Sequence, residues 1–468
     1  MNTPRSRCET VLGCIAAVLA LSACGGAPAP SAAKASPSAP ALPTACPSLT
    51  PTAVADCSPH DYNPAYKPPP GWNGPVFKPS LAFPKQLPKD QPTPWMKYDF
   101  KTQAKEYLMA ARAYIYEGNV GRGASDWDVA TNPVRTWYHM PWRWYGDHGR
   151  EFVHGLTMEM PSAPGALDPK QKDWRYTWAV AMYGPVAGFT LGQVWRDGGA
   201  APPDLKAADF ASGALVTKLL FTTATASEVP EVEGAYEWPA DVYTDVQSAC
   251  PCVTAGCPRG ITTVRLIQID IAIKDPRATE TVWVFGNLVY DKNAPGQSAW
   301  DKMVPLGLMW GNDPWLTAAM KDQKPKQSVV FYDRETSPFA TFAGIADLPP
   351  DVGGYEHLGC HGRLSGPVDN PKSACLSCHA TSQYPPANAF PRGNISLCDD
   401  PATNGPLWRN IPGGTVWKTC VAPTFALDYS LEMASAAQNY YQCRRVDTAC
   451  DDPATPAKEP EAMVRRYQ

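Results

Sequence analysis

Apolar and polar residues alternate along several segments near the centre of the chain. The clearest is 267–273, where four isoleucines are separated by single residues that include Gln268 and Asp270. The same period of two runs through 174–182 and 215–221, and an apolar stretch follows at 282–285. Because strand side chains point alternately to the two faces of a sheet, this period predicts antiparallel strands with one buried face.

The later part of the chain lacks this alternation. The segment 362–371, at the end of the Gly- and Pro-rich stretch 353–371, cannot form a regular helix, whereas 426–442 is compatible with one. Proline supplies 51 of the 468 residues, about twice its usual share, which favours many loops over long helices. We therefore predict a mainly β fold with α segments (α+β), built on an antiparallel sheet core.

The N-terminus has the pattern of an export signal. Arg5 and Arg7 precede an apolar run at 11–21, which is too short for a membrane span. The run ends in Leu-Ser-Ala-Cys, with Cys24 last, and this resembles the lipobox of bacterial lipoproteins. The resemblance implies cleavage after residue 23 and lipid on Cys24. The alternative is a plain cleaved signal.

Composition narrows the possible functions further. The segment 24–58 is rich in Ala, Pro, Ser and Thr and is predicted to be a flexible tether. The formal charge of -4 gives no sign of nucleic-acid binding. The rest divides into a β-rich central region, 59–340, and a Cys-rich C-terminal region, 341–468.

The number of cysteines fits an oxidising compartment. Of the 15 cysteines, Cys8 and Cys14 leave with the signal peptide and Cys24 takes lipid. The other twelve are Cys46, Cys57, Cys250, Cys252, Cys257, Cys360, Cys375, Cys378, Cys398, Cys420, Cys443 and Cys450. Without Cys375 and Cys378, ten remain and allow up to five disulfides, whose connectivity spacing alone does not fix.

The segment 375–379 carries the most specific chemistry. It spells Cys-Leu-Ser-Cys-His, the C-x-x-C-H attachment signature of a c-type haem. Cys375 and Cys378 would each form a thioether to a haem vinyl group, which places His379 under the iron as proximal ligand. This cysteine and histidine content gives about 0.007 such matches by chance. The signature predicts one covalent haem c.

Two other interpretations of these cysteines remain open. Cys375 and Cys378 can form a redox-active dithiol, or they can join Cys360 and His361 in a zinc site. The first interpretation normally needs a βαβ context, and the second a better-spaced ligand pair. If either holds, the protein is a structural envelope protein instead.

The chain is similar to sheet-built monohaem cytochromes. The resemblance rests on 213–220, 269–275 and 282–286, followed by the haem motif at 375–379. It points to the cytochrome c′-beta proteins and to the related hydroxylamine-oxidising cytochromes, in which a strand lysine is cross-linked to haem. Lys218 is the candidate for the position of that cross-linked lysine. The alternative is a strand lysine whose charged end simply reaches solvent.

A second resemblance covers most of the mature chain. The blocks 142–156, 283–291, 309–314 and 362–379 look like a family of large exported bacterial proteins described as cytochrome c family proteins. This resemblance implies haem and electron transfer but no particular substrate. Together with the predicted lipid on Cys24, it places the protein in the cell envelope, on the periplasmic side or at the outer membrane. It implies partners among envelope redox proteins, with the membrane contacted through the N-terminal lipid.

The sixth iron ligand decides between two functions. Met433 is the first candidate, 54 positions after His379, and it makes the protein a one-electron carrier. The alternative for Met433 is a core residue on a helix face. An open sixth position would instead make a haem enzyme or gas-binding protein acting on peroxide, nitric oxide or hydroxylamine.

An aromatic-rich segment offers further candidates for a haem pocket. It carries three histidines, His139, His148 and His154, which could line the pocket. The alternative for each is a structural or surface histidine. Arg143 and Arg150 match the geometry of haem propionates, with ordinary salt bridges as the alternative.

Overall fold

The structure is a computed structural model. It describes residues 70–73, 76–121, 131–143, 149–244, 258–278, 282–310, 328–330, 364–369, 374–385, 416–418 and 423–443. All of them belong to one unit, Leu42–Gln468. The predicted signal, tether and boundary near 340 lie outside the described residues.

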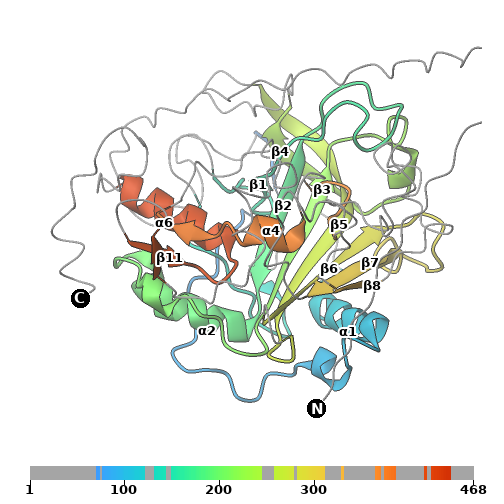
Figure 1. Cartoon of the computed structure of the whole chain (residues 1–468). Coiled ribbons are helices and arrows are strands. Elements are labelled where there is room, and N and C mark those ends of the chain that lie inside the picture. Colours follow the sequence, from blue (N-terminus) through green and yellow to red (C-terminus); the bar gives the residue numbers. More distant parts are fainter. Residues whose placement is uncertain are drawn as a thin grey trace, which may run out of the picture. The chain divides into compact units, whose positions relative to one another are not determined.

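An antiparallel sheet forms the centre of the described chain (Figure 1). Its strands run in the order β1-β2-β3-β5-β6-β7-β8, and β4 pairs with the first half of β5. Their bounds are β1 Thr157–Met158, β2 Thr177–Tyr183, β3 Leu215–Thr222, β4 Glu237–Tyr243, β5 Arg259–Lys274, β6 Trp283–Tyr290, β7 Met303–Trp310 and β8 Ser328–Val330. This sheet confirms the predicted antiparallel core.

Strand β5 carries the four isoleucines that marked it in the sequence. Ile267, Ile269, Ile271 and Ile273 are all buried. In register, Asp270 pairs with residue 218 of β3 and residue 287 of β6. The even-numbered residues of β5 therefore form the second face of the sheet, and this face is where the polar positions of the pattern lie.

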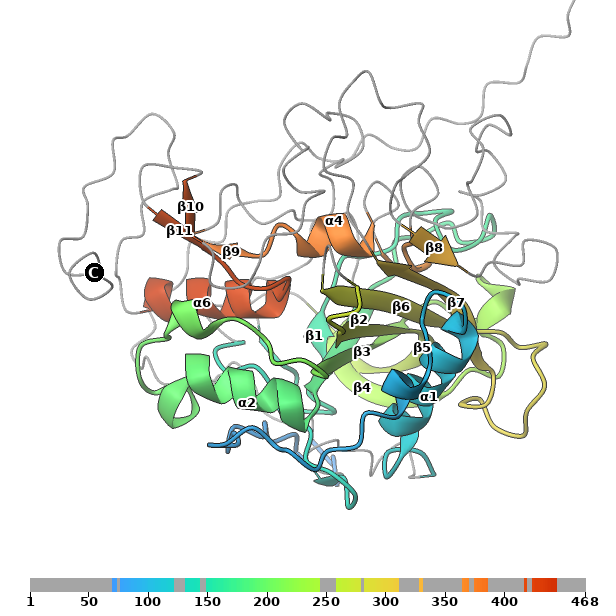
Figure 2. The ribbon, with the colours of Figure 1, turned by 60° about the horizontal axis from the view of Figure 1, so that its bottom comes forward.

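Two helices cover opposite faces of the sheet. A Cβ on Gly286 would come within 2.8 Å of Leu108 of helix α1 (Ala104–Tyr116). The next residue, Asn287, contacts Cys375 of helix α4 (Cys375–His379). Since successive strand residues face opposite sides, α1 and α4 lie on opposite faces, as Figure 2 shows.

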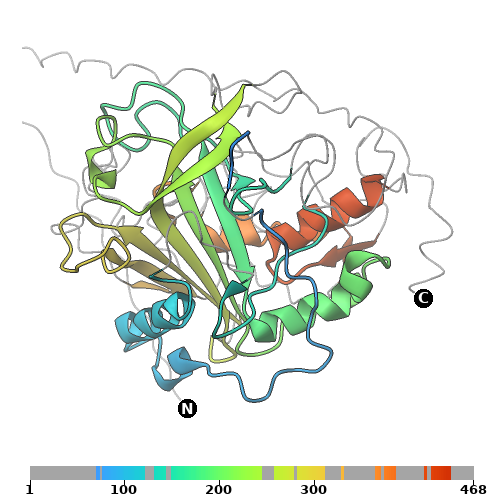
Figure 3. The same cartoon turned by 180° about the vertical axis from the view of Figure 1, so that it is seen from behind.

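Helix α6 (Leu431–Cys443) forms in the region around 426–442, which the sequence left compatible with a helix. It lies beside α2 (Pro185–Val194), as seen from behind in Figure 3. The Tyr440 ring of α6 packs edge-on against Trp142, with centroids 5.0 Å apart. It also meets Trp195, which follows α2, at 6.4 Å.

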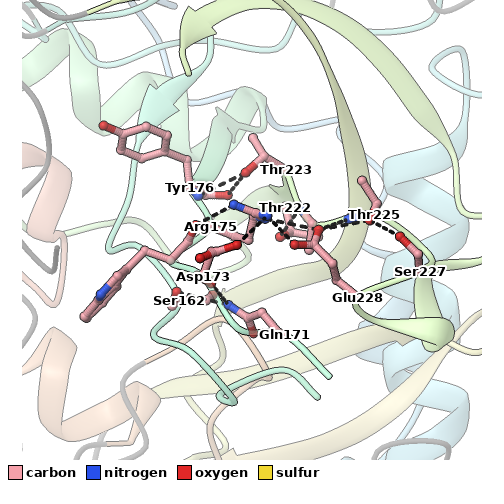
Figure 4. Close-up of polar contacts among 12 residues, drawn as sticks. Ser162, Gln171, Asp173, Arg175, Tyr176, Thr222, Thr223, Thr225, Ser227 and Glu228 are labelled. Carbon is pink, nitrogen blue, oxygen red and sulfur yellow. Dashed lines mark hydrogen bonds and ion pairs between the residues drawn. The ribbon is translucent and has the colours of Figure 1, made fainter. Parts of the chain in front are cut away.

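A polar cluster fastens the start of β2 to the loop after β3 (Figure 4). Arg175 Nε donates to Glu228 Oε2 at 3.1 Å, and the Arg175 Nη2 atom pairs with the other carboxylate oxygen. The Thr225 amide and hydroxyl donate to the same carboxylate, at 3.0 and 2.9 Å. The cluster thus clamps two segments that are far apart in sequence.

Short elements complete the described fold. They are the 3-10 helices η1 Pro94–Lys97, η3 Arg196–Gly199, η4 Leu205–Ala207 and η5 Pro230–Val232, and a three-stranded sheet of β9 Gln383–Tyr384, β11 Pro423–Ala426 and β10 Val416–Lys418. Leu364, Leu376 and Met433 belong to the same hydrophobic core as the large sheet. The C-terminal elements therefore pack on the sheet and do not form a separate core.

Candidate functional site

Helix α4 places the two motif cysteines and the histidine within about one turn. Cys375 begins the helix, and its amide donates to the Leu364 carbonyl at 2.9 Å. Leu376 is fully buried and anchors the turn in the core. Residues three and four apart lie on one helix face, so Cys375, Cys378 and His379 share a side. Neither Cys375 nor Cys378 is in a disulfide.

His379 is held by one hydrogen bond to the backbone. Its Nδ1 lies 2.7 Å from the Tyr429 carbonyl oxygen, and its ring packs 5.3 Å from the Phe285 ring. Burial lowers the pKa of His379, which favours the neutral imidazole. A neutral ring that donates from Nδ1 keeps its lone pair on Nε2, the form in which histidine binds a metal.

The Tyr429 carbonyl is presented by a tight turn. The Ser430 amide donates to the Leu427 carbonyl at 2.9 Å, so the turn spans 427–430. Its central residues, Asp428 and Tyr429, have φ of 47° and 64°. Neither is glycine, so both adopt a conformation that L-residues rarely take. The Leu427 amide also donates to the Ser382 carbonyl, which ties the turn to the chain just after α4.

The sheet face toward α4 has a partly exposed patch at its centre. It consists of Ala181, Val216, Lys218, Asp270 and Ala272 on three neighbouring strands. Residues of the opposite face in the same strands, such as Ile269 and Ile271, are buried. Cys375, Cys378 and His379 are also partly exposed. The motif and the patch thus belong to one side of the sheet.

A chain of polar contacts runs from Cys375 along this face. The Cys375 thiol lies 3.5 Å from Asn287 Oδ1, and Asn287 Nδ2 donates to Asp270 Oδ1. Gln268 Nε2 donates to both Asp270 Oδ1, at 2.6 Å, and Asp369 Oδ2, at 2.8 Å. Burial raises the pKa of the Cys375 thiol well above its usual range, and the two carboxylates add to this effect. Cys375 is therefore a thiol at neutral pH.

Lys218 lies in the patch, on the face that carries Val216 and Leu220. Its Nζ forms an ion pair with Glu159 Oε2 at 2.9 Å. Burial by itself lowers the pKa of Lys218, but Glu159 and Asp270 outweigh it and raise the pKa. The lysine is thus held as a cation by neighbouring carboxylates.

Met433 is fully buried near the start of α6. It follows Tyr429 by four residues, so it belongs to the segment that also supplies the hydrogen-bond acceptor of His379. The Met433 amide lies 3.3 Å from Ser430 Oγ. Its assignment as sixth ligand stays a prediction.

The predicted pocket residues fall in different surroundings. His139 is fully buried: its Nδ1 accepts from the Ser80 amide at 3.0 Å, and burial lowers its pKa well below the usual range. His154 stacks on Trp238 with centroids 4.4 Å apart. His148 lies outside the described residues.

Arg143 and Arg150, the residues considered for haem propionates, both approach Glu432 of α6. Arg143 Nε lies 3.1 Å from Glu432 Oε1, and Arg150 Nη2 lies 3.6 Å from it. The Arg150 side chain is 2% exposed. The contact is therefore a buried ion-pair cluster beside α6.

Most of the predicted disulfide framework lies outside the described residues. Cys443, at the end of α6, is disulfide-bonded. Within the described ranges, no group of three or more His, Cys, Asp or Glu side chains is arranged to hold a metal ion. Over the same ranges, no helix has the length and apolar character that a membrane crossing requires.

Comparisons of the chain with models of known protein families, with curated proteins and with solved structures gave no match.

Sequence reasoning did not identify Asp428, Tyr429 or Asn287 as parts of this site. Asp270 had a usable signal, because the isoleucine period placed it on the polar face of β5. Tyr429 contacts His379 through its backbone carbonyl. Because every residue has such a carbonyl, the residue type gives no signal for this contact.

Proposed function

We propose that this chain is an exported, lipid-anchored c-type cytochrome with one covalent haem c, and that it transfers single electrons in the cell envelope. The observation that carries the proposal is the arrangement of α4, where two thiols outside any disulfide and a neutral histidine share one side. Bound haem supplies an iron that accepts and releases one electron. Cys375 and Cys378 would hold the macrocycle, and His379 Nε2 would bind the iron.

The residues around α4 fit such a group. His379 has its Nδ1 engaged by the Tyr429 carbonyl, which fixes the tautomer that a proximal ligand needs. The partly exposed patch at 181, 216, 218, 270 and 272 offers a surface against which a flat macrocycle would pack. Its small residues, Ala181 and Ala272, leave room for close approach.

The dithiol alternative has less support. Redox-active cysteines in C-x-x-C motifs normally have a depressed thiol pKa. Burial and the nearby Asp369 and Asp270 carboxylates instead raise the pKa of Cys375 well above its usual range. These surroundings oppose the thiolate that disulfide exchange needs. The cysteine and histidine considered for a zinc site with α4, at 360 and 361, lie outside the described residues.

Covalent haem is tested by exporting the protein in a host with haem-attachment machinery. After denaturing electrophoresis, haem staining should follow the wild-type polypeptide, because thioether bonds survive denaturation. The Cys375→Ser/Cys378→Ser double variant should lose the stain. Ser377→Ala is the matched control, since it changes the same segment but keeps both motif cysteines, and it should keep the stain. A wild-type chain without stain would refute the proposal.

A second candidate function is a haem protein with an open iron position, and the place of Met433 favours it. Met433 lies on the segment that carries the Tyr429 carbonyl, the acceptor of His379 Nδ1, and its side chain is fully buried in the hydrophobic core. If Met433 stays a core residue, the sixth position would be open to small ligands.

Absorption spectra with and without carbon monoxide separate the two functions. Electron transfer with Met433 as ligand predicts a low-spin spectrum that carbon monoxide leaves unchanged in the wild type and shifts in Met433→Ala. A wild-type spectrum that is high-spin and shifts with carbon monoxide would overturn the carrier. Peroxide, nitric oxide and hydroxylamine would then be the ligands to test.

A further inference from the structure

The Asp428 carboxylate is buried beside the turn that contacts His379. Its Oδ2 accepts from Lys274 Nζ at 2.6 Å and from the Phe210 amide at 2.8 Å. Its Oδ1 accepts from Trp283 Nε1 at 2.9 Å. The side chain is 1% exposed. Lys274 and Trp283 are register partners where β5 meets β6, so two donors fix Asp428 to one end of the sheet and the Phe210 amide supplies a third from the segment before β3.

This anchor holds a backbone conformation that the residues themselves disfavour. Asp428 and Tyr429 both have positive φ, 47° and 64°. Such conformations persist where the surrounding structure over-determines them. Here the carboxylate is bound to the sheet and the Leu427 amide is bound to Ser382. The result is a fixed position for the Tyr429 carbonyl, 2.7 Å from His379 Nδ1.

We propose that Asp428 is a positioning residue that holds the Tyr429 carbonyl on His379 and thereby sets the donor strength of that histidine. This inference rests on the proposed haem function. A hydrogen bond from Nδ1 makes the imidazole a stronger donor at Nε2, and a stronger donor stabilises the more positive, oxidised iron. Loosening the turn should therefore raise the reduction potential.

Two substitutions with opposite charge changes test the positioning role. Asp428→Asn removes a negative charge, and Lys274→Gln removes the positive charge that anchors it. Positioning predicts that both raise the potential, because both loosen the turn. If only the change in charge acted on the iron, Asp428→Asn should raise the reduction potential and Lys274→Gln should lower it. Asp275→Asn is the matched control: this carboxylate is fully buried, paired with Arg277 at 2.6 Å, and accepts from the Tyr107 hydroxyl at 3.0 Å, so its partners belong to other segments than the turn.

We expect each variant to raise the reduction potential by at least about 59 mV. For a one-electron couple this is a tenfold change in the ratio of reduced to oxidised protein, measured at the midpoint potential of the wild type. The His379 Nδ1 proton should also exchange faster with solvent in both variants, as measured by NMR. Opposite shifts of the potential, or unchanged potential and exchange, would overturn the inference. If Asp428→Asn does not fold, Trp283→Phe removes a single donor to Asp428 and should give the same two changes at smaller size.

The haem-free protein keeps this test separate from the proposed function. In the Cys375→Ser/Cys378→Ser background, nitrogen-15 NMR of His379 reports whether Nδ1 carries the proton and is protected. Adding Asp428→Asn should abolish that protection, and retained protection would refute the positioning role. Absence of covalent haem in the wild type would instead refute the proposed function.

Discussion

The Glu228 carboxylate is kept ionised by Thr225, which is close in sequence, and by Arg175, which is distant in sequence. Burial alone would raise its pKa, but the hydrogen bonds from Arg175 and Thr225 outweigh burial and lower it. A carboxylate with a depressed pKa stabilises the fold only while it is ionised. Its contribution is complete above the unfolded-state pKa of about 4.3 and is lost as the pH falls through the lower folded-state value.

We expect Glu228→Gln to lower the free energy of unfolding by about 1 kcal/mol at pH 7, as for a partly buried ion pair. The difference from wild type should shrink as the pH falls below the unfolded-state pKa, because wild type then loses the same charge. Urea denaturation between neutral and acid pH measures both effects.

Glu237→Gln is the control for this prediction. Glu237 pairs with Arg265 at 2.8 Å, but its side chain is 52% exposed, against 18% for Glu228. Exposed pairs contribute less because water screens them, so the control should lose less stability. An equal loss in both variants, or a Glu228→Gln difference that does not depend on pH, would contradict the role given to the Arg175 clamp.

At the scale of elements, the segment 364–369 links the sheet to α4. The Val368 amide lies 3.3 Å from Gln268 Oε1, and the Leu364 carbonyl accepts from the Cys375 amide. Gly366 lies so close to β5 that a Cβ there would come within 2.0 Å of Gln268 Oε1. The segment therefore packs against β5 only because residue 366 has no side chain.

We expect Gly366→Ala to cost about 1–3 kcal/mol of stability, the range for overpacked sites. Gln268 would have to leave its place between Asp270 and Asp369, so the link from the sheet to α4 would loosen. Thermal unfolding and the fraction of chains with covalent haem should both fall.

Gly260→Ala, in strand β5 against which the segment 364–369 packs, is the matched control. A Cβ on Gly260 would meet only Thr244 Cγ2, at 3.7 Å, which is an ordinary contact distance. This variant should keep its stability and its haem. Equal behaviour of the two variants would show that the close approach at Gly366 does not hold the segment in place.

The elements themselves were predictable to different degrees. The isoleucine period located β5, and the same alternation marked β3, which pairs with β5, and β2, which pairs with β3. Strands β4 and β7 contain Pro239 and Pro305, which weaken a strand pattern. The structure tolerates them because β4 pairs only with β5 and Pro305 lies at a register shift. Helix α1 had a usable helical spacing, Tyr107, Leu108, Ala111 and Ile115, that the sequence reasoning left unused.

For the whole molecule, the lipid on Cys24 is the feature proposed to fix its location. We expect Cys24→Ser to move the exported protein from the membrane fraction to the soluble fraction, since the thiol that takes lipid is gone. Cell fractionation with haem staining measures this. Cys14→Ser, inside the predicted signal peptide, is the control and should stay with the membrane. A Cys24→Ser protein that remains membrane-bound would refute the anchor.

The sequence by itself determined the features that depend on local pattern: the antiparallel strands and the C-x-x-C-H motif with its predicted chemistry, while it only allowed the helix that forms at 431–443. Only the tertiary structure decided what surrounds the motif. The Tyr429 carbonyl on His379, the Asp428 anchor and the Asn287 contact with Cys375 join residues 50, 154 and 88 positions apart. Such contacts depend on how distant segments pack together, and no local spacing of residue types specifies that packing.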